Sequence, residues 1–176
     1  MTASEKEKAK ITRLTKRTWC GVPVEIEVSS ENWHRVTVAG VPLPHPGLVN
    51  FISRWEMPVE ARLRLTEQHE FAHLQVLLIP LIHLALMLHI GRRESSSQRW
   101  PRVLAGLLAN HALWEIASES YVAASSPRDY YIPTSRFGRW LYTSFWGLML
   151  FVVIAGTMAA TGLIRFHAEE PFAKSR

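Results

Sequence analysis

The chain has 176 residues, of which 48% are hydrophobic, and a formal net charge of +5 at pH 7. This length fits one domain with at most a small appendage. Much of the positive charge lies in the N-terminal tail and in arginines that flank apolar runs, a pattern typical of membrane–water boundaries that gives no support to nucleic-acid binding.

The N-terminal part is polar. Residues 1–17 are rich in lysine and lack the apolar core of a signal peptide, so we expect a flexible charged tail. Val22–Val28 alternates apolar and polar residues, which predicts a half-buried strand. Turn-forming residues at 29–32 precede a second predicted strand at Arg35–Leu43, and the two strands form a plausible hairpin.

Prolines at 42, 44 and 46 and Gly47 then predict a break in regular structure. Apolar residues at helical spacing between Leu48 and Trp55 indicate a short amphipathic helix. Pro58 suits the first turn of the next helix. We expect that helix to run on to Ile90, with a kink at Pro80.

Three apolar runs follow. Leu74–Ile90 has seventeen uncharged residues, and Trp140–Ile164 has twenty-five, enough to cross a hydrocarbon layer of ~30 Å. A third run lies in the helix that restarts at Pro101 and ends near Ser125, and it carries His111, Glu115 and Glu119. These runs predict a multi-pass integral membrane protein with about three membrane-embedded helices.

A metal-binding motif lies just before the first apolar run. His69-Glu70-Phe71-Ala72-His73 fits the pattern HExxH. On a helix the two histidines lie one turn apart on the same face, so both imidazoles can reach one metal ion. Glu70 is then placed to take a proton from a metal-bound water.

Helix geometry suggests where a third ligand lies. If the helices at 74–90 and 101–124 are antiparallel, residues at equal depth have numbers that sum to about 191. His73 then faces the neighbourhood of residue 118, within about one turn of Glu115 and Glu119. Carboxylates in an otherwise apolar helix are costly unless something compensates them, and a cation beside two imidazoles would do so.

HEFAH followed by Glu115-Ile116-Ala117-Ser118-Glu119 resembles the gluzincin pattern of zinc metallopeptidases. The resemblance implies one zinc ion bound by His69, His73 and Glu115, with Glu70 as general base and Glu119 supporting a histidine. Gluzincins usually have Asp at the position of Glu119. The N-terminal hairpin and the two functional helices are similar to the minigluzincins, and the resemblance covers roughly Val22 to Ala124.

The resemblance also implies an α+β fold, with a small sheet packed on an active-site helix and a glutamate helix. The catalytic region then spans residues 18–126 and includes the first membrane hairpin. A connecting loop, the last transmembrane helix and a tail occupy residues 127–176. The implied substrate is a peptide or protein.

Gluzincins also use a Tyr or His donor for the oxyanion that forms during peptide hydrolysis. His111, Tyr121, Tyr130 and Tyr131 are the candidates, and the sequence does not rank them well. Cys20 is the single cysteine, which excludes an intrachain disulfide. Cys20-Gly21-Val22-Pro23 resembles the cysteine switch of matrix metalloprotease propeptides, which would make Cys20 a latency ligand, although Cys20 could simply precede the strand.

Two other classes of protein stay open. Membrane di-iron oxygenases use His-x-x-x-His, but they need further paired histidines. A non-enzymatic haem protein would use His83 or His89, for which packing and hydrogen bonding is the simpler role. A cytoplasmic N-terminal segment would place the active site near the inner face of the membrane, whereas the Arg-rich turn at residues 91–102 favours the opposite orientation.

Overall fold

The computed structural model describes residues 11–29, 33–46, 56–91, 99–128, 130 and 133–163. In this part of the chain four strands precede four helices: β1 (Ile11–Arg17), β2 (Pro23–Ser29), β3 (Trp33–Val38), β4 (Val41–Pro46), α2 (Val59–Gln75), α3 (Leu78–Gly91), α4 (Arg99–Ser125) and α5 (Arg136–Ala160). The strands form one antiparallel sheet in the order β1-β2-β3-β4. The α+β prediction is therefore confirmed.

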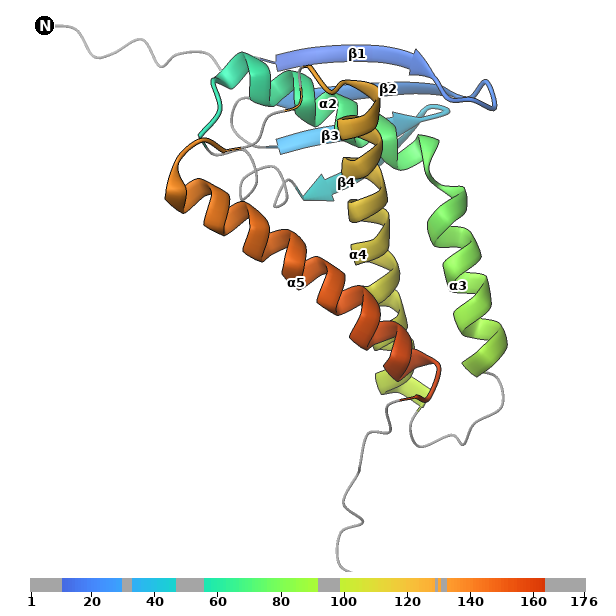
Figure 1. Ribbon diagram of the computed structural model, residues 1–176. Helices are drawn as coiled ribbons and strands as arrows, with labels where there is room; N and C mark the ends of the chain where they lie inside the picture. The colour runs from blue at the N-terminus through green and yellow to red at the C-terminus, as the bar shows by residue number, and fades with distance from the viewer. Residues whose placement is uncertain are drawn as a thin grey trace, which may run out of the picture.

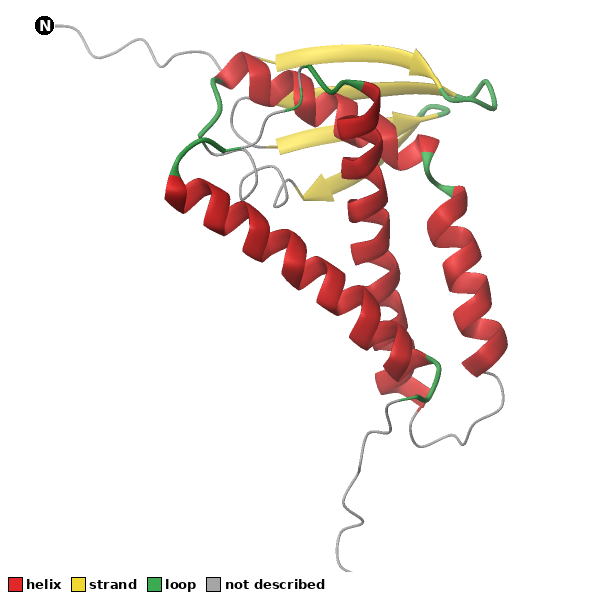
Figure 2. Cartoon of the chain, in the orientation of Figure 1, coloured by secondary structure: helices red, strands yellow, loops and turns green. Residues whose placement is uncertain are grey.

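The molecule has two ends of different character. The strands gather at one end, with α2 lying along the sheet (Figure 1). The helices α3, α4 and α5 extend away from this end (Figure 2). Helix α4 packs against α2, α3 and α5, so it connects the two ends.

The core under the sheet follows the alternation seen in the sequence. Val24, Ile26 and Val28 on β2 are all buried, and they pack with Val36 of β3 and Leu63 of α2. Successive side chains of a strand point to opposite faces, so these three share the face that α2 covers. The predicted strand at residues 22–28 is confirmed.

The prediction of a flexible tail over residues 1–17 is wrong for its last seven residues. Residues 11–17 form β1, which pairs with β2 from Ile11 opposite Ser29 to Arg17 opposite Pro23. Leu14 packs against the core, while Arg13 on the solvent face contacts Glu27, with 2.6 Å between Nε and Oε1. The charged residues on the outer face of β1 resemble those of a solvated tail, and the pairing with β2 is needed to recognise the strand.

The predicted strand at residues 35–43 is two strands. Ala39 and Gly40 have φ values of 49° and 84° and form the turn between β3 and β4. Two successive residues with positive φ are typical of a type I′ hairpin turn. Prolines 42, 44 and 46, predicted to end regular structure, lie in β4, an edge strand, where a missing N–H is tolerated. The predicted helix at residues 48–55 lies outside the described residues.

The predicted continuous helix is broken between α2 and α3, and the two parts meet at a bend of 48°. The break lies at Val76 and Leu77, not at Pro80. Pro80 has no N–H to donate to the carbonyl of Val76 four residues earlier, and that carbonyl instead accepts from the N–H of Ile79 at 2.9 Å. The proline therefore breaks the helix about one turn before its own position.

One described helix, α5, is long and apolar enough to cross a membrane, and α2 with α3 passes the same test only as a bent pair. This supports one span of the three that the sequence predicts. Helices α4 and α5 approach closely where Gly156 faces α4, since a Cβ there would lie 2.7 Å from the carbonyl oxygen of Ala105. Small residues permit this kind of helix contact.

Candidate metal centre

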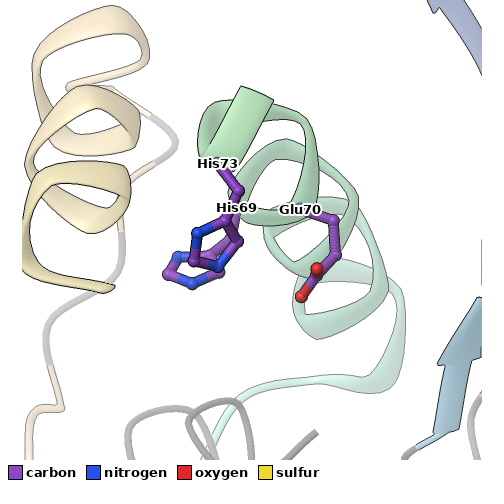
Figure 3. Close-up of side chains that lie close together, drawn as sticks. All are labelled: His69, Glu70 and His73. Carbon is purple, nitrogen blue, oxygen red and sulfur yellow. The ribbon is translucent and has the colours of Figure 1, made fainter. Parts of the chain in front are cut away.

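Helix α2 carries three buried polar side chains in one turn. His69, Glu70 and His73 are 1%, 2% and 5% exposed, and the two imidazole centroids lie 4.7 Å apart. Figure 3 shows both rings on the same side of the helix, with Glu70 projecting from the neighbouring position. One ligand atom from each residue lies within 4.8 Å of the others, so this group could hold a metal ion.

Helix α4 brings Glu115 to both histidines. Glu115 is 1% exposed, and its Oε2 lies 3.0 Å from His69 Nε2 while its Oε1 lies 3.5 Å from His73 Nε2. Two atoms that bind one tetrahedral ion at about 2.0–2.1 Å are roughly 3.3 Å apart. The two N···O distances, one to each carboxylate oxygen, lie on either side of that value, so Glu115 is close enough to both histidines to be a third ligand.

The far side of each imidazole is held by a hydrogen bond. His69 Nδ1 lies 2.8 Å from Glu119 Oε2, and His73 Nδ1 lies 2.8 Å from Ser118 Oγ. The Ser118 hydroxyl donates its hydrogen to the Trp114 carbonyl, so it must accept from His73 Nδ1–H. The His73 ring is thus fixed with its hydrogen on Nδ1 and its Nε2 lone pair free for a metal. His69 lies between two carboxylates, and Glu119 would hold its hydrogen on Nδ1 when a metal binds at Nε2.

The pairing of residues at equal depth on antiparallel helices, made from the sequence, agrees with the structure at His73. His73 and Ser118 are the residues whose numbers sum to 191, and their side chains are in contact. His69 meets Glu115 and Glu119 rather than residue 122, since α2 bends away from the line of α3. Ser118 was not singled out from the sequence, although the same count pointed at its position.

The surroundings of Glu115 favour its ionised form. Burial acts to raise the pKa of Glu115, but the hydrogen bond with His69 and the nearby His73 and His111 hold that pKa below its usual value. Glu115 and Glu119 are both buried within one turn of α4. A divalent cation between the imidazoles and Glu115 would offset this concentration of negative charge.

Tyr130 lies behind the centre. Its hydroxyl donates to Glu119 Oε1 at 2.8 Å and also contacts the hydroxyl of Tyr142 on α5. Burial, followed by the charge of Glu119, raises the pKa of Tyr130, so it stays protonated and remains a donor. Tyr130, one of the oxyanion candidates, is therefore engaged with Glu119, and Tyr131 lies outside the described residues.

The other predicted residues differ in their distance from the centre. The His111 side chain is 60% exposed, and its Nε2 lies 3.7 Å from Glu115 Oε1, so it borders the centre. Tyr121 is exposed and lies six residues after Glu115, about 240° around the helix. Cys20 lies in the exposed turn between β1 and β2, where a hydrogen bond with Thr18 lowers the pKa of its thiol.

His83, further along the chain, takes the simpler role of the two considered for it. His83 is hydrogen-bonded through both ring nitrogens, by Nδ1 to Asn110 at 3.1 Å and by Nε2 to Thr157 at 2.9 Å. It therefore joins α3, α4 and α5, and neither nitrogen is left for haem. His89 is exposed near the end of α3.

Comparison with known proteins does not add to this description. No family model matches the chain. No curated protein and no solved structure matches it either. The fold and the centre thus define the chain as an α+β protein with a buried His–Glu–His group that could hold a metal ion and one helix that could span a membrane.

Proposed function

We propose that the chain is an integral-membrane zinc metallopeptidase with a gluzincin-like centre. The observation that carries this proposal is the convergence of His69 and His73 on one carboxyl group, Glu115, from a separate helix. Two imidazoles and one carboxylate, with a fourth position left for water, form the usual ligand set of a catalytic zinc ion. Calcium and magnesium favour all-oxygen sites, which makes them poorer fits.

The reaction proposed for this centre is the hydrolysis of a peptide bond. Zinc in such a site lowers the pKa of bound water and polarises the scissile carbonyl. Glu70 is buried on the turn that carries both histidines, where it would accept the proton of the attacking water and return it to the leaving amine. His111, at the exposed border of Glu115, is our candidate for the donor to the oxyanion.

We also propose that α3 and the first half of α4 lie in the bilayer with α5. Large apolar side chains are exposed along all three helices, whereas soluble proteins bury most of them. They are Leu78, Ile79, Leu81, Ile82, Leu86, Leu88 and Ile90 on α3, Trp100, Val103, Leu104, Leu107 and Leu108 on α4, and Phe137, Trp140, Leu148, Leu150, Phe151, Ile154 and Met158 on α5.

The proposed membrane boundary lies close to the centre. Leu108 precedes Glu115 on α4 by seven residues, which is about 10 Å along the helix. Leu78, the first residue of α3, follows His73 by five residues across the bend between α2 and α3. A peptidase centre at this height would meet polypeptide segments that emerge from the bilayer. An edge strand of the sheet could pair with such a segment through main-chain hydrogen bonds, with little selectivity for sequence.

Metal content and peptide cleavage, measured together, test the proposal. The purified protein in detergent is expected to contain one zinc per chain and to cleave a peptide library, and a chelator is expected to stop cleavage. Glu70→Ala should retain the zinc and lose at least about a hundredfold in kcat, the lower range for a lost general base. Cleavage at the wild-type rate by this variant would overturn the mechanism, and two irons or haem per chain would overturn the class.

A further inference from the structure

We propose that α5 positions the metal centre through two tyrosines, Tyr142 and Tyr130, which hold Glu119 against His69. This inference rests on the proposed metal site but not on the reaction carried out there. Helix α5 would then be more than a membrane anchor. Its Tyr142 would belong to the support of a ligand that lies on α2.

The hydroxyl groups form a directed chain. Tyr130 donates its single hydroxyl hydrogen to Glu119 Oε1 at 2.8 Å. A phenol has one hydrogen to give, so the contact between Tyr130 and Tyr142 requires Tyr142 to donate and Tyr130 to accept. Each bond in this chain therefore runs toward Glu119.

Glu119 is held from both sides. Its Oε1 accepts from Tyr130, and its Oε2 lies 2.8 Å from His69 Nδ1. Two bonds to opposite oxygens fix the plane of the carboxylate, which one bond would leave free to turn. With a metal bound at Nε2, this orientation of Glu119 would hold the hydrogen of His69 on Nδ1 and so direct Nε2 to the ion beside Glu115, whose Oε2 lies 3.0 Å from Nε2.

The chain joins four separate segments. Tyr142 lies on α5, Tyr130 in the loop before it, Glu119 on α4 and His69 on α2. Glu119 is 6% exposed and Tyr130 and Tyr142 are partly buried, so water competes weakly for these bonds. Removal of the Tyr142 hydroxyl would act on His69 through Tyr130 and Glu119, which makes Tyr130 and Tyr142 positioning residues.

The test is the affinity for zinc, measured on the full chain in detergent by competition with a chromogenic chelator. Loss of a group that orients a metal-bound histidine typically costs 10–100-fold in metal affinity. We expect Tyr130→Phe to weaken zinc binding about tenfold, and Tyr142→Phe to weaken it by a smaller factor. Thr143→Val, which removes an exposed hydroxyl from the next position on α5, should leave the affinity unchanged.

A double-mutant cycle separates positioning from a general loss of structure. In a Glu119→Gln background, Tyr130→Phe should add little to the loss, because its effect passes through Glu119. The zinc-free Tyr142→Phe and Thr143→Val proteins should both still unfold in one cooperative transition, so that a difference in zinc affinity does not come from a loss of fold.

The outcomes are distinct. Wild-type zinc affinity in both tyrosine variants would overturn this inference and leave the proposed function standing. Full additivity of Tyr130→Phe and Glu119→Gln would also overturn it. A wild-type chain that binds no zinc would overturn the proposed function and this inference together.

Discussion

The two halves of α4 have opposite surfaces. Up to Leu108 its large apolar side chains are exposed, and Trp100, Leu104 and Leu107 are examples. From Glu115 to Glu119 the helix instead buries two carboxyl groups and a hydroxyl. Water favours neither arrangement, since exposed apolar surface and buried charge both cost free energy. A bilayer around the first half and a cation beside the second would account for both.

His73→Ala should have the largest effect, because it removes a ligand on α2 from the centre to which the second half of α4 contributes Glu115. We expect loss of bound zinc and of peptide cleavage, measured by metal analysis and by digestion of the peptide library. His89→Ala removes an exposed imidazole from α3 and should leave both unchanged. Full zinc content in the His73 variant would contradict the assigned ligand set.

Ile82→Lys tests the proposal that α3 and the first half of α4 lie in the bilayer. Ile82 on α3 and Val41 on the sheet are both 60% exposed. A lysine at Ile82 should cost roughly 2.5–3.5 kcal/mol of membrane insertion if that position lies near the bilayer centre, and it should raise the fraction extracted from membranes at alkaline pH.

Val41→Lys is the matched control and should leave extraction unchanged. Equal extraction of the two variants, or an Ile82 variant that is more soluble and still folded without detergent, would remove the reason to place α3 in the bilayer.

Gly156→Ala should destabilise the contact between α4 and α5. The added Cβ would lie 2.7 Å from the carbonyl oxygen of Ala105, and overpacking of this kind costs about 1–3 kcal/mol. Gly147→Ala adds the same group where nothing lies within 4 Å, and it should stabilise the helix by up to about 1 kcal/mol. Thermal unfolding in detergent should therefore shift in opposite directions, and shifts of the same sign would refute the close packing.

Thr157→Val should have the smallest effect. It removes the partner of His83 Nε2, and hydrogen bonds between membrane helices contribute about 0.6 kcal/mol on average. We expect a slight fall in the midpoint of thermal unfolding and unchanged zinc content. A loss of zinc in this variant would show that the polar cluster around His83 is coupled to the centre.

The sequence predicted the centre better than the fold around it. HExxH spacing and a count along antiparallel helices were enough to bring His69, His73 and Glu115 together, because helical rise is nearly constant. The strands were harder. β1 carries charged residues on its outer face, so its strand character shows only in its pairing with β2. The turn at Ala39 and Gly40 has alanine where such turns usually have asparagine, aspartate or glycine.

The contacts of Tyr130 with Glu119 and Tyr142 could not be predicted from the sequence, for a different reason. Tyr130 was a candidate for the reaction itself, and nothing in local spacing indicated that its hydroxyl lies on Glu119. The loop that carries it has no regular period from which a position can be counted. Only the packing of α5 beside α4 brings Tyr142 to the same place.

The bend before Pro80 gives α2, which carries the two histidines, and the apolar helix α3 different directions. With α2 and α3 in one line, the two histidines of α2 and the exposed leucines of α3 would lie along one axis. A bend of 48° lets α2 follow the sheet while α3 leaves it. One imino acid therefore sets the direction in which α3 leaves the helix that carries the histidines, and moving it by one residue would turn that direction by about 100° around the helix axis.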